Sequence, residues 1–312
     1  MIVTLTMNPT VDKSAKVNQV VSERKLRCHS PRLDPGGGGL NVSRAIKKLG
    51  GDSLAMYSCG GPNGQILQSL LDQEGIAHRA VAIKGWTRES FSVLEEATGL
   101  QYRFNLPGPE LIPAEWQQCL DALSAIEPRP DYIVASGSLP PGVPADFYAR
   151  VAKLAQQMGA RLVVDTSGDA LREAARAQVF LLKPNLRELS DLSGVPLDDE
   201  PSQETAALDL IEKGYCQGVV LSLGTSGVLF VTKAERERVR SPIVPIISKI
   251  GAGDSMVAGI VLGLARGQSL RQAVCLGVAA GAAAVMTPGT ELCRREDTER
   301  LYDLLQSGSG GL

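Results

Sequence analysis

Residues 249–256 read Lys-Ile-Gly-Ala-Gly-Asp-Ser-Met and join two glycines to one carboxylate directly before a long apolar run. A helix that begins here points its free N–H groups and positive dipole end at whatever precedes it, commonly a phosphate. Asp254 adds a candidate general base beside this anion site. The alternative is an ordinary turn in which Asp254 caps the helix, and for four residues taken alone that interpretation is favoured. The surrounding sequence has to decide between the two.

The composition is that of a globular protein with one large core. The chain has 312 residues, 44% of them hydrophobic, with a formal net charge of -2 and a pI near 5.9. The sequence has no internal repeat and no interdomain linker, so residues 1–312 are predicted to form a single domain. It also has no long basic run, which argues against nucleic acid as a partner and favours small acidic ligands.

The sequence predicts a cytoplasmic protein without a membrane segment. Its first residues lack the basic and apolar regions of a signal peptide. The longest apolar stretch, 273–286, is shorter than the about 20 residues that span a bilayer, and its Gly and Ala content predicts a buried helix. Six cysteines occur without a Cys-x-x-Cys pair, which favours reduced thiols over disulfides or a zinc site.

Strands and helices alternate along most of the chain. Short apolar runs such as 132–136 and 162–165 are separated by segments of helical period, which predicts an α/β fold with a largely parallel central sheet. Two polar excursions, 13–35 and 86–106, interrupt this alternation. They are predicted to pair as a small β-sheet lid over the ligand-binding edge of the main sheet.

Three further local predictions follow from the same patterns. Asp12 is expected in a loop just past the carboxyl end of the first strand, where open α/β sheets bind ligands, and is a candidate acceptor for a sugar hydroxyl. Residues 236–247 are expected to form a strand. Residues 307–311, rich in Gly and Ser, are expected to be a flexible tail.

Several kinds of phosphate and hydrolytic site are excluded by inspection. The sequence contains no Gly-Lys dipeptide, which rules out a Walker A loop, and its glycine clusters do not match Gly-x-Gly-x-x-Gly. With only His29 and His78, a Ser-His-Asp triad or a histidine metal site is disfavoured. Phosphoryl transfer fits what remains: Asp254 takes a proton from the attacking hydroxyl while the N–H groups of Ala252 and Gly253 hold phosphoryl oxygens.

Two distant motifs carry a resemblance to a known family. Gly36-Gly37-Gly38-Gly39-Leu40-Asn41 and Gly251-Ala252-Gly253-Asp254-Ser255 resemble the paired signatures of the PfkB (ribokinase-like) carbohydrate kinases, and the similarity extends over essentially the whole chain. Within the family it is greatest to the bacterial 6-phosphofructokinase branch of the isozyme II type. The resemblance implies a Rossmann-like three-layer α/β/α domain with a β-sheet lid that usually forms a homodimer interface.

The same resemblance implies a reaction and a sugar-side site. The reaction is the glycolytic transfer of a phosphoryl group from ATP with Mg²⁺ to D-fructose 6-phosphate, giving fructose 1,6-bisphosphate. Asp254 is the expected general base, with Gly251, Ala252 and Gly253 as the anion hole. The positions matching sugar or sugar-phosphate contacts are Asp12, Lys25, Arg27, Gly37, Gly38, Asn41, Arg88, Arg103 and Ser138. Guanidinium and ammonium groups suit a phosphate chemically.

On the nucleotide side, the resemblance implies ATP contacts and two metal sites. The matching ATP positions are Lys183, Asn185, Glu188, Ser222, Gly224, Gly227 and Gly281. Glu188 would hold Mg²⁺ through water, and the alternative for Gly281 is close helix packing. Relatives bind K⁺ near the anion hole, and the matching positions are Ser248, Ile250, Ala284, Thr287, Gly289 and Glu291.

One position bears on the choice of substrate. Relatives that act on fructose 1-phosphate or tagatose 6-phosphate typically have lysine where this chain has Gly38, which favours the 6-phosphofructokinase branch. Tagatose-6-phosphate kinase and 1-phosphofructokinase remain alternatives within the family. A non-catalytic regulator that binds sugar phosphates on the same fold is the alternative from a different class, and an intact Asp254 argues against it.

Overall fold

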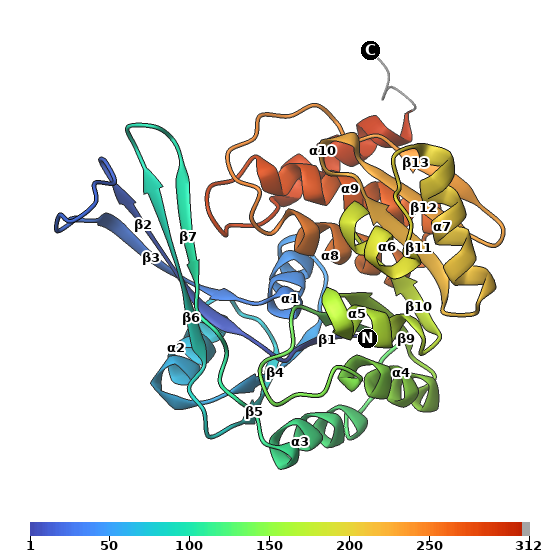
Figure 1. Cartoon of the computed structure of the whole chain (residues 1–312), viewed down its shortest axis with the longest axis horizontal. Helices are drawn as coiled ribbons and strands as arrows, with labels where there is room; N and C mark the ends of the chain where they lie inside the picture. Colours follow the sequence, from blue (N-terminus) through green and yellow to red (C-terminus); the bar gives the residue numbers. More distant parts are fainter. Residues whose placement is uncertain (308–312) are drawn as a thin grey trace.

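The computed structural model of the protein describes residues 1–307, so the tail predicted at 307–311 lies outside them except for Ser307. These residues form a nine-stranded main sheet with helices on both faces (Figure 1). Its strands are β1 (Ile2–Thr6), β4 (Leu54–Cys59), β5 (His78–Ala82), β8 (Tyr132–Ser136), β9 (Arg161–Asp165), β10 (Val179–Leu182), β11 (Cys216–Ser222), β12 (Val228–Thr232) and β13 (Arg236–Val239). The order is β13-β12-β11-β10-β9-β8-β1-β4-β5.

The pairing within this sheet explains where the ligand edge lies. Every neighbouring pair from β11 through β10, β9, β8, β1 and β4 to β5 is parallel. At the edge, β12 pairs antiparallel with both β11 and β13, so β12 is the one strand of this sheet that runs in the opposite direction. Both β1 and β8 are buried at every residue, as expected for central strands covered on two faces. The carboxyl ends of the parallel strands therefore meet at one edge, and the predicted three-layer α/β/α fold is confirmed.

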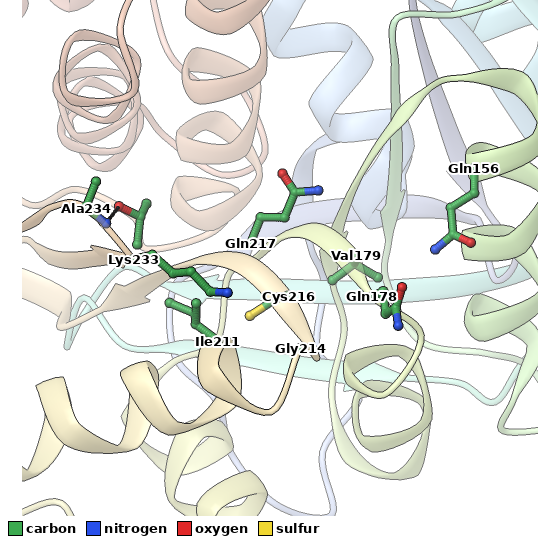
Figure 2. Close-up of a pocket in the computed structure, with 10 residues that line it drawn as sticks. Gln156, Gln178, Val179, Ile211, Gly214, Cys216, Gln217, Lys233 and Ala234 are labelled. Atoms are coloured by element: carbon green, nitrogen blue, oxygen red, sulfur yellow. Dashed lines mark hydrogen bonds between the residues drawn. The ribbon is translucent and has the colours of Figure 1, made fainter.

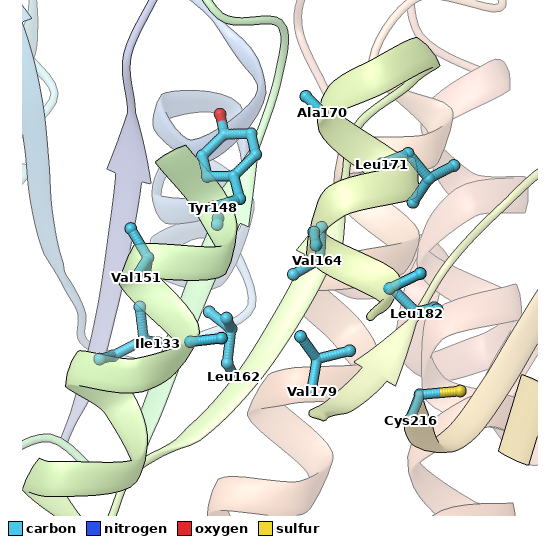
Figure 3. Packing of buried hydrophobic residues seen from close by; sticks show 14 of the residues in the cluster. Ile133, Tyr148, Val151, Leu162, Val164, Ala170, Leu171, Val179, Leu182 and Cys216 are labelled. Atoms are coloured by element: carbon cyan, nitrogen blue, oxygen red, sulfur yellow. The ribbon is translucent and has the colours of Figure 1, made fainter. Parts of the chain in front are cut away.

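Helices cover the two faces as separate layers. One layer consists of α3 (Pro113–Ser124), α4 (Phe147–Met158), α5 (Gly168–Ala175), α6 (Leu186–Ser193) and α7 (Glu200–Glu212). Tyr148 and Val151 of α4 and Leu171 of α5 pack there against strand residues such as Val164 and Leu182 (Figure 3). The opposite layer consists of α1 (Gly38–Lys48), α8 (Ala252–Ala265), α9 (Leu270–Val285) and α10 (Arg295–Gln306). A further helix, α2 (Gly61–Gln73), packs Leu67 and Leu71 beside β4.

Helices α8 and α9 approach each other through glycines. A Cβ atom at Gly259 would lie 2.7 Å from the carbonyl oxygen of Leu276, and one at Gly277 would lie 2.8 Å from that of Met256. Such distances are too short for a real Cβ atom, so only glycine at these two positions allows the helices to lie this close together. The buried helix predicted at 273–286 is therefore α9, and it holds α8 backbone against backbone. Among the described residues, no helix has the length and apolarity needed to cross a membrane.

The two excursions pair with each other in a second sheet of four strands. These are β2 (Thr10–Val17), β3 (His29–Gly36), β6 (Arg88–Glu95) and β7 (Gln101–Asn105), in the order β3-β2-β6-β7. Strands β2 and β6 are parallel, and this lid stands beside the main domain in Figure 1. The loop predicted for Asp12 is wrong, because the lid begins at Thr10 and Asp12 lies within β2 opposite Asp34 and Ser90.

Two other local predictions are corrected. The strand predicted over 236–247 ends at Val239, because Pro242 and Pro245 have no N–H for a ladder. Residues 186–193, for which no helix was predicted, form α6. Its capping box is built by Asn185 Oδ1, which accepts from the Glu188 N–H at 2.9 Å, and Glu188 Oε2, which accepts from the Asn185 N–H at 2.8 Å.

Candidate active site

The N-terminus of α8 is an open anion site. The helix begins at Ala252, and Gly251 is the N-cap with a φ of 74°, a left-handed conformation that glycine adopts without steric cost. No side chain among the described residues caps this end, so the N–H groups of Ala252 and Gly253 remain available to a ligand. Asp254 is the third helical residue and not the cap. The interpretation of this stretch as an ordinary capped turn is therefore wrong.

The Asp254 carboxylate is held from the opposite direction. Asn41 Nδ2, on α1, donates a hydrogen bond to Asp254 Oδ2 at 2.9 Å. Burial raises the pKa of Asp254 to about 6, and the nearby Asp165 and Asp12 add to this shift. The hydrogen bond from Asn41 and the charge of Lys183 oppose it. Asp254 is thus ionised at pH 7 yet basic enough to take a proton, as a general base must be.

A buried cation lies next to this base. Lys183 follows β10, has a side-chain exposure of 8%, and places Nζ 3.0 Å from Asp165 Oδ1 at the end of β9. Burial alone would lower the pKa of Lys183, but the charge and hydrogen bond of Asp165 together with the charges of Glu188 and Asp254 make the net shift upward. A Cβ at Gly253 would lie 3.8 Å from Lys183 Nζ. The ammonium and the helix N-terminus therefore offer two positive features to one anion.

Asp165 was not among the predicted site residues, although a signal for it was present in the sequence. Asp165 ends a strand that was predicted correctly at 162–165, and carboxyl ends of parallel strands point to ligands. The same rule was applied to Asp12 but not here. Asp165 keeps Lys183 charged and adds negative charge near Asp254.

On the lid side, Asp12, Arg103, Ile250 and Thr290 line a small pocket between the lid and the loop before α8. Burial raises the pKa of Asp12 to about 6, while the charges of Arg88 and Arg103 oppose the shift. Three of the predicted sugar-side residues are thus brought together, and they lie near the N-terminus of α8. The pocket combines a hydroxyl acceptor with cations, as a phosphorylated sugar requires.

Arg88 has a second role in the structure. Its Nε and Nη2 donate to the Asn8 carbonyl oxygen at 3.3 and 3.2 Å, and its Nη1 donates to the Leu106 carbonyl oxygen at 3.3 Å. Asn8 Nδ2 in turn donates to Ser138 Oγ at 3.1 Å. Arg88 therefore ties the point where the chain enters the lid to the point where it leaves. Asn8 was not predicted as part of the site.

Two predicted sugar-phosphate contacts are not brought to this pocket within one chain. Lys25 and Arg27 are exposed on the connection between β2 and β3, at the tip of the lid away from the main sheet (Figure 1). Arg103 and Lys13 are the lid cations that line the pocket. The role assigned to Lys25 and Arg27 stays a prediction.

The four glycines at 36–39 pass very close to residues of β2 and β8. Gly37 has a φ of 113° and is the N-cap of α1. A Cβ at Gly36 would lie 2.2 Å from Asp12 Oδ2, and one at Gly38 would lie 2.3 Å from Ser136 Oγ. The glycines let the start of α1 pass between the lid and β8, which brings Asn41 to Asp254.

The predicted nucleotide-side residues come from adjacent turns. Asn185 and Ser222 form an isolated parallel bridge, and the Ser222 N–H donates to the Pro184 carbonyl oxygen at 2.9 Å. Burial raises the pKa of Glu188, opposed by the N–H of Asn185. The loops after β10 and β11 therefore form one surface next to Lys183.

Three glycines predicted to contact ATP have local structural roles. Gly224 begins a short 3-10 helix, η1 (Gly224–Ser226), with a φ of 60°. Gly227 has a φ of 93°, and a Cβ there would lie 2.1 Å from the Val239 carbonyl oxygen. A Cβ at Gly281 would lie 3.2 Å from the Ala252 carbonyl oxygen. Gly281 thus brings α9 close to the first turn of α8, which is the packing alternative for that residue.

Most positions predicted for a monovalent cation lie side by side. Ser248 Oγ donates to the Gly289 carbonyl oxygen at 3.2 Å, and the Ile250 N–H donates to Ser248 Oγ at 3.2 Å. Thr287 Oγ1 donates to the Ala284 carbonyl oxygen at 2.8 Å. Carbonyl and hydroxyl oxygens are ligands that hard cations accept, so this donor set fits K⁺ chemically.

The acidic positions predicted near the metals are engaged with protein partners. Glu291 Oε1 accepts from Arg294 Nε at 2.7 Å, and this hydrogen bond lowers the pKa of Glu291. Glu188 accepts from Asn185 through Oε2. Within residues 1–307, no group of three or more His, Cys, Asp or Glu side chains could hold a metal ion. Glu188 therefore fits Mg²⁺ as one member of a shell completed by water and phosphate oxygens, which is common for this ion.

A larger hollow is unrelated to this chemistry. It lies at the opposite, amino-terminal ends of β10 and β11, among Gln178, Gln217 and Lys233 (Figure 2). The candidate catalytic residues follow the carboxyl ends of the same strands. We therefore assign the site to the edge that carries Lys183 and Asp254.

Comparison with known proteins gives consistent matches over the whole length. The sequence profile of the pfkB family carbohydrate kinases matches residues 2–297. The chain is 48% identical to the ATP-dependent 6-phosphofructokinase isozyme 2 of Mycobacterium tuberculosis, over 97% of this chain and 89% of that protein. It is 42% identical to the protein of the same description from Escherichia coli, over 97% and 98%.

Solved structures agree with these sequence matches. Phosphofructokinase-2 from Escherichia coli in complex with potassium superposes with a TM-score of 0.94 at 42% identity, covering 98% of this chain and 99% of that one. The same protein in complex with fructose-6-phosphate gives a TM-score of 0.92 at 41% identity, with the same coverage.

Proposed function

The chain belongs to the pfkB family of carbohydrate kinases, and from this premise we propose that it phosphorylates D-fructose 6-phosphate with ATP. The products are fructose 1,6-bisphosphate and ADP, a step of glycolysis. The relatives with 48% and 42% identity carry this activity in their names, and one structural relative was solved with fructose-6-phosphate.

One observation carries the catalytic part of the proposal. Asp254 lies in the first turn of α8 without capping it, and Asn41 holds one oxygen of its carboxylate at 2.9 Å. Asp254 accepts the proton of the sugar 1-hydroxyl as that oxygen attacks the γ-phosphorus, and the bond to the β-phosphate oxygen breaks. The N–H groups of Ala252 and Gly253 and the Lys183 ammonium stabilise the charge on the transferring group.

The remaining residues bind and orient the substrates. Asp12 accepts a hydrogen bond from the sugar, and Arg88 and Arg103 attract its phosphate. The turn at 183–188 and the turn at 222–227 receive the nucleotide, and Glu188 would hold Mg²⁺ through water. Bound Mg²⁺ neutralises charge on the ATP phosphates. A monovalent cation near Ser248 and Thr287 is supported by the oxygen donors there and by the potassium-bound relative.

The position of Gly38 supports fructose 6-phosphate over the alternatives. A side chain at residue 38 would begin 2.3 Å from Ser136 Oγ and 2.8 Å from the Gly137 nitrogen, which leaves no room for the lysine typical of relatives that use fructose 1-phosphate or tagatose 6-phosphate. Tagatose-6-phosphate kinase and 1-phosphofructokinase activities are the alternatives to test.

The test is ADP release with Mg²⁺ and K⁺ across fructose 6-phosphate, fructose 1-phosphate, tagatose 6-phosphate and free fructose. We expect the highest kcat/KM with fructose 6-phosphate. A higher value with another acceptor would reassign the substrate. The Asp254→Asn variant is the matched control, and turnover should fall about 10²- to 10⁴-fold while fructose 6-phosphate still binds. Equal turnover in wild type and variant would remove Asp254 from its role as the base. No turnover by the wild type on any of the four sugars would instead favour a binding protein.

We further propose a cytoplasmic homodimer formed through the lid. All six cysteines are free thiols, and the lid exposes apolar side chains, with Leu33 at 44%, Phe91 at 39% and Phe104 at 56% exposure. A relative was solved in a tetrameric inhibited form, so larger assembly is an outcome to examine. Light scattering of the wild type and of Phe104→Glu tests this, and a mass of one chain for the wild type would contradict it.

A further inference from the structure

Arg44 is the largest fully buried side chain among the described residues, and it lies on α1 one turn after Asn41. A guanidinium stays charged and offers only donors, so it is tolerated inside a protein only where acceptors surround it. Glu74 supplies two acceptors, at 2.7 Å from Arg44 Nε and 2.6 Å from Nη2. This fork leaves Nη1 free for other partners.

The remaining donors of Arg44 reach three parts of the site. Nη1 lies 2.8 Å from the Pro35 carbonyl oxygen on β3, 3.3 Å from Asn41 Oδ1, and 3.5 Å from the Thr290 carbonyl oxygen. Asp34 Oδ1 is 3.7 Å from Nη2, and Asp34 Oδ2 accepts from Thr290 Oγ1 at 2.8 Å. One cation thus contacts the lid, the helix that carries Asn41, and the loop that includes Thr290.

The contact with Asn41 decides which way its amide points. A side-chain amide has an acceptor oxygen at one end and a donor nitrogen at the other, and its orientation follows from its partners. Because Arg44 has no acceptor, only Asn41 Oδ1 can face it. Asn41 Nδ2 must then face Asp254, to which it donates at 2.9 Å. A reversed amide would present its oxygen to the carboxylate and repel it.

We propose that Arg44 is a positioning residue that fixes the amide of Asn41 and so holds Asp254 Oδ2, leaving the other carboxylate oxygen for the sugar hydroxyl. The inference rests on the proposed function for the role of Asp254 as the base. Burial of an ion pair is weak support for stability alone, since apolar residues of similar volume often serve as well. The distance from Arg44 to Asn41 Oδ1 is what links the buried charge to the reacting carboxylate.

The test compares Arg44→Lys with Glu74→Gln. Lysine keeps the charge but cannot bind Glu74 as a fork and reach Asn41 together. Glu74→Gln weakens the fork and leaves the contact with Asn41 in place. The NMR signal of the Asp254 carboxyl carbon is followed against pH without substrate, and it is assigned as the signal that is missing from Asp254→Asn. Thermal unfolding measures the stability of each variant.

We expect Arg44→Lys to move the titration of Asp254 to higher pH, because the hydrogen bond that favours its charged form is loosened. Glu74→Gln should lower the stability of the fold but leave the titration of Asp254 at the same pH. The other charged groups that act on Asp254 are Asp165, Lys183 and Asp12, and neither variant changes them. Identical titrations in wild type and Arg44→Lys would overturn the inference.

A kinetic cycle gives an independent measurement. Arg44→Lys should lower kcat at pH 6 by about tenfold with a smaller change in KM, and should have no further effect on kcat in an Asn41→Ala background. An equal loss in both backgrounds would show that Arg44 does not act through Asn41. If Arg44→Lys does not fold, the double variant Arg44→Gln with Glu74→Gln removes both charges of this ion pair, with Glu74→Gln alone as its control. A wild type without turnover on any sugar phosphate would defeat the proposed function, while the NMR titration would still test Arg44.

Discussion

The acidic side of the pH–rate profile tests the two carboxylates of the site together. Asp254 and Asp12 both have a pKa raised to about 6, in each case mainly by burial, and both are required as carboxylates. A group that acts when ionised is lost as the pH falls through its pKa. Activity should therefore be complete above pH 7 and disappear between pH 7 and pH 5.

The size of the loss follows from the two values. A carboxyl group with a pKa of about 6 is about nine-tenths ionised at pH 7 and about one-tenth ionised at pH 5. Two such groups together lower kcat/KM by about a hundredfold over this interval. Carboxyl groups at their unperturbed values, near pH 4, would lower it by less than about 1.3-fold.

The assay is kcat/KM for fructose 6-phosphate from pH 4.5 to 8, measured by ADP release. The sugar phosphate titrates near pH 6 as well, so its dianion fraction is measured by phosphorus NMR and divided out. Asp12→Asn should leave a shallower acidic limb with one ionisation. A corrected loss of less than about threefold between pH 7 and pH 5 would refute the assigned roles.

Further variants address the other parts of the site. Asp254→Asn should raise the free energy of unfolding by about 1 to 3 kcal/mol at pH 7 in urea denaturation, because burial disfavours the charged form of Asp254 at pH values above its unfolded-state pKa. This gain should vanish below pH 4, where the carboxyl group is protonated in both states. Equal stability of wild type and variant at pH 7 would contradict the raised pKa. Arg88→Ala should raise KM for the sugar phosphate about ten- to a hundredfold and KM for ATP much less, whereas equal rises would indicate damage to the fold. Lys183→Met should lower the rate of phosphoryl transfer about a hundredfold in single-turnover measurements, and an unchanged rate would exclude Lys183 from charge stabilisation. Gly38→Ala should lose about 1 to 3 kcal/mol of stability by crowding Ser136, and adding Ser136→Ala should restore part of it.

The sequence was most informative where the pattern is periodic and local. The strand at 132–136 was predicted at its observed bounds and the strand at 162–165 to within one residue, because short apolar runs between turns are typical of central parallel strands. The strand predicted over 236–247 failed at its two prolines, a signal that was present but given too little weight. Helix α6 was missed because Asn185 and Glu188 were interpreted only as ligand contacts, although the same spacing is a capping box.

The loops that form the site could be predicted from the sequence, but the hydrogen bonds that join residues of different loops could not. Asp254, Asn41 and Asp12 could be identified from motifs, yet no pattern joins residues that lie 213 positions apart, as Asn41 and Asp254 do. Arg44 gave no signal because a helical arginine ordinarily faces solvent. Its burial depends on Glu74 and on a carbonyl at Thr290, which only the folded chain brings together.

The glycine contacts between α8 and α9 have a consequence for how this protein can be changed. With backbone against backbone at Gly259 and Gly277, any larger residue there would displace the helix whose first turn holds the base. The pair of helices α8 and α9 is therefore a fixed frame in which the contact positions accept no larger side chain. The lid is joined to this frame by several contacts, among them the carbonyls bound by Arg88 and the bond from Thr290 to Asp34. We expect substrate-induced movement to be greatest in its four strands, whereas Gly38 at the start of α1 contributes to sugar preference from the fixed side.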